Sequence, residues 1–431
     1  MADRITVIGW DGTPLTEAAG AALAAATLVA GAPYQLNALP VPAAAERLVL
    51  GNVQLAARRI AEHRGAAVVV AEGDPGFFGV VRTLRRPEYG LELEVLPAVS
   101  SVAAAFARAG MPWEDAQVVS AHGGRLRRAA NICRAHQKVA VLTAPGAGPI
   151  ELALMLRGVH RTFVVCEALG TDEEDVTVLT SDRVADHDWR DPNVVLVIGG
   201  NSGGPQNGAV SEAAGWLAGR PVGYPGPERG WALPAEAYAG AGSVSDAPGA
   251  PGASDTLPAH VRALVLARLG ARPGDLVWSV GAGSGALAVE AARFGAAVVA
   301  VEADRSACAR LAVNARRYGV EVETVHGGGP EVLGGLPEPD AVVVEAGGPA
   351  VVRAALARRP ERFVAVARAF AEAEELRRAI AEAGYRADGA LLQSTPLEAA
   401  PADPAGAGAG AGLRLGAGAA GVLLLWGEQI V

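Results

Sequence analysis

The segment 275–304, DLVWSVGAGSGALAVEAARFGAAVVAVEAD, decides the fold of the second half of the chain. Its apolar residues 276–280 predict a buried strand, and the glycines of 281–285 predict a tight loop. Residues 286–294 predict a helix, and a second strand ending at Glu302 follows that helix. Strand, glycine loop, helix and strand together make one right-handed β-α-β unit.

The glycine loop of this unit indicates a nucleotide-type site. A loop rich in glycine can bring backbone N–H groups against a ligand, and Glu302 comes where the ribose of an adenosine would lie. The alternative is a turn that needs glycine for its geometry alone. We favour the nucleotide-type site because the spacing of the glycines, the helix start and the acid fits that of a nucleotide-binding β-α-β unit.

The loop fits two ligand templates. Gly281, Gly283 and Gly285 resemble the loop of class I S-adenosylmethionine-dependent methyltransferases. Gly281, Gly283 and Ala286 also satisfy the looser dinucleotide fingerprint G-x-G-x-x-A. Gly285 and the predicted helix 258–269 before the first strand favour the methyl donor. A nicotinamide-dependent oxidoreductase remains the alternative.

The composition is that of a globular chain with more than one domain. The chain has 431 residues, of which 51% are hydrophobic and 19% are charged, so it can form two or three cores. The formal net charge is −9, whereas a nucleic-acid-binding domain is expected to be basic. We therefore expect no nucleic-acid partner.

The cysteines and histidines predict no protein-bound metal. Cys133, Cys166 and Cys308 are far apart and share no ligand spacing, so we interpret them as small buried residues. The histidines form no ligand cluster. No charged segment precedes an apolar one at the N-terminus, and no apolar run approaches the length of a membrane span. We expect a soluble cytoplasmic protein with no membrane partner.

Strands alternate with helices along the chain, which predicts an α/β fold. We expect a first domain over residues 1–200, a linker rich in glycine and proline over 201–255, and a second domain over 256–431. Within the linker, residues 230–234 are apolar enough to dock. Residues 401–418 are mostly alanine and glycine, and we expect a mobile loop there. Nine strands are predicted in the first domain: residues 4–8, 27–31, 66–73, 93–98, 118–120, 138–143, 161–167, 177–180 and 193–200.

Two loops at strand ends of the first domain could hold a ligand. The loop 73–79, GDPGFFG, has a glycine that permits close backbone approach and a proline that stiffens the turn. Asp74 could instead close an Asx-turn. Ser100 and Ser101 follow the next strand, 93–98, and they could instead cap the helix after them. Because both loops follow strands of one domain, we expect a shared cleft.

Longer stretches resemble a known family. Residues 72–79, 96–123 and 143–149 resemble the tetrapyrrole methylase family. Residues 261–304 and 325–342 resemble the class I methyltransferase domain that decarboxylates its substrate in corrin synthesis. The resemblance implies a two-lobed α/β domain of the tetrapyrrole methylase type, followed by a Rossmann-like class I methyltransferase domain.

The resemblance also implies function. It implies S-adenosylmethionine as the methyl donor, a precorrin as the substrate, methylation at C5 and C15, loss of carbon dioxide from the C12 acetate, and a homo-oligomer. The substrate is polyanionic, so Arg125 and His122 are candidate contacts, beside Arg127 and Arg128. Solvated helix charge is the alternative for the arginines, and a turn histidine is the alternative for His122. The donor-site residues implied by the family pattern are Gly73, Asp74, Pro75, Gly79, Ser100, Ser101 and Thr143 in the first domain, and Gly281, Gly283, Gly285, Glu302, Gly328 and Gly329 in the second.

The second domain departs from the family pattern at three positions. In the family pattern an acid is usual at Ser279 and a threonine is expected at Leu257, where this chain has Thr256 one place earlier. The pattern also has a run of glycines where this chain has Glu345. A carboxylate at Glu345 would repel a polyanionic substrate unless it is protonated or turned away. A C5-methyltransferase with a degenerate second domain is therefore a further alternative.

Overall fold

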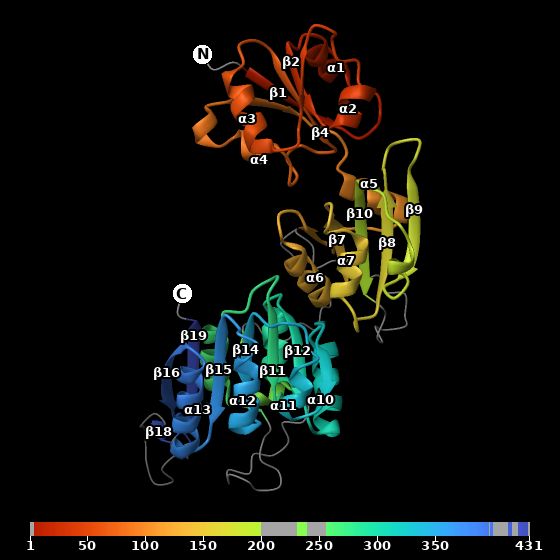
Figure 1. Cartoon of the computed structure of the whole chain (residues 1–431). Helices are drawn as coiled ribbons and strands as arrows, with labels where there is room; N and C mark the ends of the chain where they lie inside the picture. The colour runs from red at the N-terminus through yellow and green to blue at the C-terminus, as the bar shows by residue number, and fades with distance from the viewer. Residues whose placement is uncertain are drawn as a thin grey trace, which may run out of the picture. The chain divides into compact units, whose positions relative to one another are not determined.

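The computed structural model describes residues 4–199, 231–238, 256–395, 397–399, 413–415 and 421–429 (Figure 1). The chain divides into two units, and each is described by itself. The first contains residues up to 127 and 138–199, and the second contains residues 128–137 and the described residues from 231 onward. Most of the predicted linker, and most of the predicted mobile loop, lies outside the described residues.

A parallel five-stranded sheet forms the first lobe of the first unit, in the order β3-β2-β4-β1-β5. Ile5 and Val7 of one strand face α3 and α4, whereas Ile8 faces α1 and α2, so the sheet is covered on both sides (Figure 1). The elements are β1 (Arg4–Trp10), α1 (Glu17–Ala24), β2 (Leu28–Gly31), α2 (Pro33–Ala38), β3 (Glu46–Val49), α3 (Val53–Glu62), β4 (Ala67–Glu72), α4 (Val81–Leu84) and β5 (Glu92–Leu96).

The first helix begins later than the pattern Thr13-Pro14 suggests. Thr16 is its N-cap, with the Oγ1 atom accepting a hydrogen bond from the Ala19 backbone N–H at 3.3 Å. Thr13 instead donates its hydroxyl to Asp11 Oδ1 at 2.6 Å. Thr13 therefore belongs to the loop after β1, which also lines the candidate site described below.

A mixed five-stranded sheet forms the second lobe, in the order β6-β7-β10-β8-β9. Only β6 and β7 run parallel, and the other neighbours are antiparallel. Helix α5 packs on this sheet through Val102 and Phe106. The elements of this lobe are α5 (Ser101–Ala109), β6 (Gln117–Ser120), β7 (Lys138–Leu142), α7 (Pro149–Met155), β8 (Arg161–Glu167), β9 (Asp175–Thr180) and β10 (Asn193–Gly199). Helix α6 (Leu126–Ala135) follows β6 in the chain, and all but its first two residues belong to the second unit.

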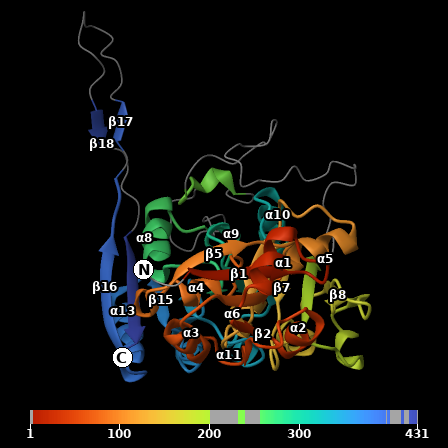
Figure 2. The same cartoon turned by 90° about the horizontal axis from the view of Figure 1, so that it is seen from above.

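The second unit contains a seven-stranded sheet in the order β13-β12-β11-β14-β15-β19-β16. Its first five strands are parallel, and β19 runs antiparallel to both of its neighbours. The edge strand β16 lies beside β19 and α13 (Figure 2). The strands are β11 (Leu276–Val280), β12 (Ala297–Glu302), β13 (Glu323–His326), β14 (Ala341–Val344), β15 (Arg362–Ala367), β16 (Tyr385–Leu392), β17 (Leu397–Ala399), β18 (Leu413–Leu415) and β19 (Val422–Gln429). The helices are α8 (Ala259–Leu269), α9 (Ala286–Arg293), α10 (Arg305–Arg317), α11 (Pro330–Leu333), α12 (Gly348–Leu356) and α13 (Phe370–Glu382).

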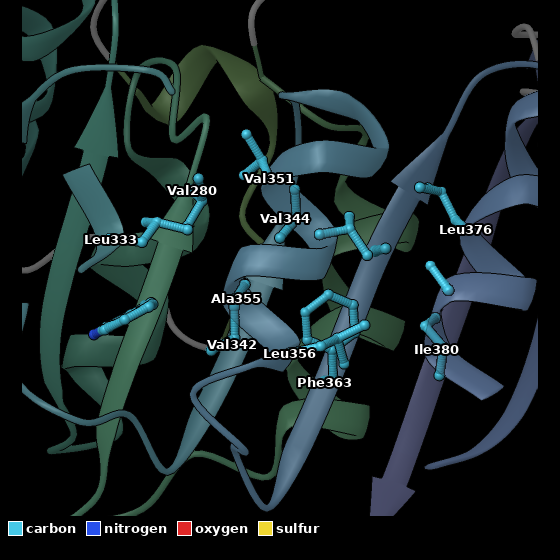
Figure 3. Packing of buried hydrophobic residues seen from close by; sticks show 14 of the residues in the cluster. Val280, Leu333, Val342, Val344, Val351, Ala355, Leu356, Phe363, Leu376 and Ile380 are labelled. Carbon is cyan, nitrogen blue, oxygen red and sulfur yellow. The ribbon is translucent and has the colours of Figure 1, made fainter. Parts of the chain in front are cut away.

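Apolar side chains cover both faces of this sheet. Figure 3 shows Val342 and Phe363 of the sheet beside Leu356 of α12, with Ile380 of α13 in the same cluster. In β11, Leu276 and Trp278 belong to this cluster, whereas Val277 between them faces the opposite side of the sheet, in the cluster formed with α8 and α9. This alternation fixes the register of β11 and thereby the position of the glycine loop that follows it. The Rossmann-like prediction is confirmed.

The short segment 231–238 packs on the second unit, as its apolar residues predicted. Leu233 and Tyr238 are buried against α9 and α10. The Glu290 carboxylate accepts hydrogen bonds from the backbone N–H groups of Ala232 at 2.6 Å and Leu233 at 3.2 Å, and from Tyr238 Oη at 2.5 Å. Arg262 Nε donates to the same carboxylate at 3.2 Å, and both charged side chains are fully buried.

Candidate functional site

The first unit has a cleft of about 720 Å³ at the ends of β1 and β4 and the start of α5. Residues 168–173 also line it. Trp10 and Tyr34 stack with their ring centroids 6.2 Å apart and give the cleft an aromatic wall. A volume of this size suits a small molecule or a cofactor.

Asp11 follows β1 directly and lines the cleft. Its Oδ1 accepts hydrogen bonds from the Thr13 backbone N–H at 3.1 Å and from the Thr13 hydroxyl, while its Oδ2 accepts one from the Val99 backbone N–H at 3.3 Å. Burial opposes ionisation, but these hydrogen bonds outweigh it and hold the pKa of Asp11 below its ordinary value. Asp11 is therefore an anion that joins the loop after β1 to the loop before α5.

Glu72, the last residue of β4, is a second acid in the cleft. Its side chain is accessible from the cleft, yet the surrounding protein atoms displace water and raise the pKa of its carboxyl. Burial, and then the negative charge of Glu72, raise the pKa of the Tyr34 phenol. The Tyr34 hydroxyl therefore remains protonated and can donate a hydrogen bond into the cleft.

Asp11, Tyr34 and Glu72 were not predicted as site residues from the sequence. A signal was present, because Asp11 and Glu72 stand at the carboxyl ends of β1 and β4. These strands are paired in parallel, with Trp10 opposite Glu72. The carboxyl ends of parallel strands meet at one edge, where ligands of α/β proteins bind.

Two residues of the predicted donor site in the first unit line this cleft, namely Gly73 and Ser101. Asp74 closes an Asx-turn, with its Oδ1 accepting from the Gly76 backbone N–H at 2.8 Å. Ser100 caps α5 by accepting from the Ala103 backbone N–H at 3.1 Å. These two side chains thus shape the loops that carry the lining residues.

The remaining predicted residues of the first unit lie outside the cleft wall. A Cβ on Gly79 would lie 2.3 Å from the Pro75 carbonyl oxygen, so Gly79 is needed for close packing within its own turn. Thr143 is buried and its hydroxyl donates to Asn193 Oδ1 at 2.7 Å, two residues from the lining residue Asp191. His122 and Arg125 are exposed, and neither lines the cleft.

The second unit has a smaller cleft of about 250 Å³ around the glycine loop. Gly281, Gly283 and Glu302 of the predicted site line it. Glu302 Oε2 accepts from the Gly283 backbone N–H at 2.7 Å, and its Oε1 accepts from the Asp304 backbone N–H at 2.8 Å. The Glu302 carboxylate therefore fastens the glycine loop to the end of β12.

Different local contacts or backbone conformations favour the glycines of the predicted second site. Gly281 has φ +71°, and a Cβ there would lie 2.7 Å from the Ala346 backbone nitrogen. Gly285 has φ +78°, and a Cβ there would overlap the Leu311 side chain. Gly328 packs against Ala303, and Gly329 precedes the short helix α11. Gly285, Gly328 and Gly329 do not line the cleft.

Ser279 and Glu345, two departures from the family pattern, form one hydrogen-bonded pair. Ser279 Oγ donates to Glu345 Oε1 at 2.8 Å. Burial raises the pKa of the Glu345 carboxyl to about 8, although the Ser279 hydroxyl lowers it. Leu257, the third departure, lines the same cleft, and its neighbour Thr256 makes a hydroxyl–hydroxyl bond of 2.6 Å with Ser284 of the glycine loop.

The described parts of the chain contain neither a metal-ligand cluster nor a membrane-spanning helix. No group of three His, Cys, Asp or Glu side chains there could hold a metal ion. No helix there is long and apolar enough to span a bilayer. Cys133 and Cys166 are buried, as predicted, whereas Cys308 is partly exposed, with its Sγ 3.6 Å from the Glu302 carbonyl oxygen.

Comparison with known proteins identifies the family. Residues 11–185 match the family of Tetrapyrrole (Corrin/Porphyrin) Methylases, and residues 256–410 match the Precorrin methyltransferase domain. The cobalt-precorrin-7 C(5)-methyltransferase of Salmonella typhimurium is 33% identical over 193 residues, which are 43% of this chain and 92% of the relative. The chain belongs to the tetrapyrrole methylase family. Its two-lobed first unit agrees with that membership.

Two further relatives are named as decarboxylating methyltransferases. The precorrin-6Y C(5,15)-methyltransferase (decarboxylating) of Sinorhizobium sp is 32% identical over 308 residues, which are 67% of this chain and 64% of the relative. The probable cobalt-precorrin-6B C(15)-methyltransferase (decarboxylating) of Pyrobaculum calidifontis is 37% identical over 114 residues, which are 25% of this chain and 58% of the relative. The match thus spans just under two thirds of the Sinorhizobium relative.

Proposed function

We propose that the chain is a two-site S-adenosylmethionine-dependent C-methyltransferase of corrin synthesis. It methylates precorrin-6Y at C5 and C15 and removes carbon dioxide from the C12 acetate, giving precorrin-8X. The observation that carries the proposal is the order of the two family matches, 11–185 and then 256–410, on a chain similar to relatives named for both methylations. We place the first site in residues 1–200 and the second in 256–431, joined by a linker over 201–255.

The residues of the first cleft fit a cationic donor beside an electron-rich ring. S-adenosylmethionine, when bound, supplies an electrophilic methyl group. Gly73, with φ +58°, allows the backbone to line the cleft closely, because a Cβ there would lie 3.0 Å from the Val99 carbonyl oxygen. The Asp11 carboxylate provides negative charge that favours a sulfonium. Positioning then carries most of the rate, and no strong base is needed.

The residues of the second cleft fit the same donor. Gly281 and Gly283 leave the loop backbone open to a ligand at the carboxyl edge of β11, and Glu302 holds that loop in place. Decarboxylation needs an electron sink, which the conjugated macrocycle of the substrate supplies. The protein therefore has to orient the C12 acetate and manage the proton that replaces carbon dioxide.

Donor binding tests the two-site proposal. Calorimetric titration of the full chain with S-adenosylhomocysteine should give two equivalents bound per chain, with no response to NAD. Glu302→Gln should weaken one of the two sites by roughly tenfold or more. The amide has one acceptor oxygen where the carboxylate satisfies two N–H groups, and an unpaired N–H costs about 1–3 kcal/mol.

The control for this titration is Glu361→Gln, which changes an exposed carboxylate away from both clefts. It should retain two equivalents. Tight NAD binding without thioether binding would support the oxidoreductase alternative, which nothing in the family matches favours. One equivalent in the unmodified chain would support the single-site alternative.

We further propose a cytoplasmic homo-oligomer. Three free cysteines, two of them buried, suit a reducing compartment. Large apolar side chains are exposed on the last strands, among them Leu391, Leu397 and Leu415, and a second copy of the chain could cover them. Light scattering on the purified chain measures the oligomeric state.

A further inference from the structure

The wall of the second cleft contains three acids, Glu302, Asp304 and Glu345. Of these three, only Glu345 has a carboxyl oxygen that accepts no hydrogen bond from the described residues. Glu302 uses both oxygens to accept backbone N–H groups. Asp304 uses both to cap α10, accepting from the Ser306 and Ala307 backbone N–H groups at 3.0 and 3.1 Å. Glu345 accepts through Oε1 from Ser279, and no described residue hydrogen-bonds its Oε2.

Glu345 also stands at the place where chemistry is expected in this fold. It follows β14, the strand beside β11, and its backbone N–H donates to the Val280 carbonyl at 2.8 Å. It thus lies at the carboxyl edge of the two central strands, next to Gly281 and in the wall of the same cleft. The Ser279 hydroxyl holds its carboxyl against β11, so the side chain has a fixed position.

Decarboxylation creates a need for an acid at this edge. The bond between the acetate methylene and its carboxylate breaks, carbon dioxide leaves, and the electron pair passes into the macrocycle. A new C–H bond must then form at the former methylene, so that the acetate becomes a methyl group. The net change consumes one proton, and a neutral carboxylic acid in the cleft is a suitable source.

We propose that Glu345 Oε2 delivers this proton, an inference that rests on the proposed function. The transfer leaves Glu345 as a carboxylate, which solvent reprotonates before the next turnover. The hydrogen bonds from Ser306 and Ala307 lower the pKa of the Asp304 carboxyl, which makes it a poorer proton donor, and both oxygens of Glu302 are already occupied by backbone N–H groups. The departure at Glu345 is then functional: a neutral carboxyl does not repel a substrate that carries many carboxylates.

The surroundings of Glu345 set the expected pH dependence. Burial raises its pKa to about 8, Ser279 and the cation Arg262 lower it, and the negative charge of Glu302 raises it. The other charged groups of the cleft are Asp304, Arg310 and Arg368. Because the acid must be protonated, carbon dioxide release should be constant at lower pH and should fall as the pH rises through about 8.

The test uses the full chain with precorrin-6Y and S-adenosylmethionine, following carbon dioxide release and C5 methylation separately across this pH range. Glu345→Gln keeps the shape and the bond from Ser279 but carries no acidic proton. It should slow carbon dioxide release by roughly a hundredfold or more and remove the fall at high pH, while C5 methylation stays unchanged. The exposed control Glu361→Gln should match the unmodified chain.

A second variant separates catalysis from packing. Ser279→Ala removes a hydrogen bond that lowers the pKa of Glu345, so the fall in carbon dioxide release should move to higher pH. A purely structural role for Glu345 would not produce that shift. Normal carbon dioxide release by Glu345→Gln, or weaker donor binding with normal release, would overturn the inference. An unmodified chain that releases no carbon dioxide would instead contradict the proposed function itself, and the inference with it.

Discussion

Replacing Gly9 by alanine should abolish the first site while leaving the second intact. Gly9 lies in β1, and a Cβ there would lie 2.3 Å from the Gly73 carbonyl oxygen and 2.6 Å from the Ala98 backbone nitrogen. Both neighbours are backbone atoms, so the loops after β4 and β5 would have to move away from β1 to make room for the added Cβ. We expect a loss of about 1–3 kcal/mol of stability and at least about a hundredfold loss of C5 methylation.

The matched control is Gly20→Ala in α1, where no atom lies within 4 Å of the added Cβ. This variant should be more stable by about 0.5–1 kcal/mol, because alanine suits a helix interior better than glycine. Product analysis and thermal unfolding measure both effects. Normal C5 methylation by Gly9→Ala would show that the loops around the first cleft do not position its ligands.

Replacing Arg262 by methionine should strongly destabilise the second unit. Arg262 and Glu290 are fully buried at 3.2 Å, and Arg262 also donates to the carbonyls of Leu233 and Leu257. Its loss leaves the Glu290 charge buried without a cation, which costs about 3–5 kcal/mol. Hydrogen exchange should increase in residues 231–238, whose backbone the pair holds. It should also increase near Leu257, which lines the second cleft.

Two comparisons check this interpretation. Arg377→Met breaks an exposed pair with Glu374 and should leave the exchange unchanged, because surface ion pairs contribute little. The double variant Arg262→Met/Glu290→Met should recover part of the lost stability, since neither charge then remains buried, although the hydrogen bonds of Glu290 to residues 232, 233 and 238 are also lost. If the single variant unfolds like the unmodified chain, the buried pair does not anchor the segment.

The strands predicted best from the sequence are those whose own residues form a continuous apolar run. Strands β1, β4, β10 and β11 are short apolar runs buried on both faces, and they lie where the pattern predicts them. The edge strand β16 was not predicted, because its residues are mostly polar or partly exposed and it depends on pairing with β19. The edge strand β3 was missed for the same reason, since its side chains are largely exposed.

The candidate sites were predicted in part. The glycine loop and Glu302 lie in one cleft because both belong to a single β-α-β unit with fixed spacing. Asp11 and Tyr34 come from segments distant from Glu72 in the sequence, and only the pairing of β1 with β4 and the folding of α2 bring them together. The pairing of Ser279 with Glu345 likewise depends on β11 lying beside β14, which the order of residues does not show.

The most direct test of the two-site account is the mass of its product. The full chain, incubated with precorrin-6Y and S-adenosylmethionine, should give a product with two added methyl groups and one carbon dioxide less. A product with one added methyl group and an intact acetate would contradict the account, because only the first site would then be active.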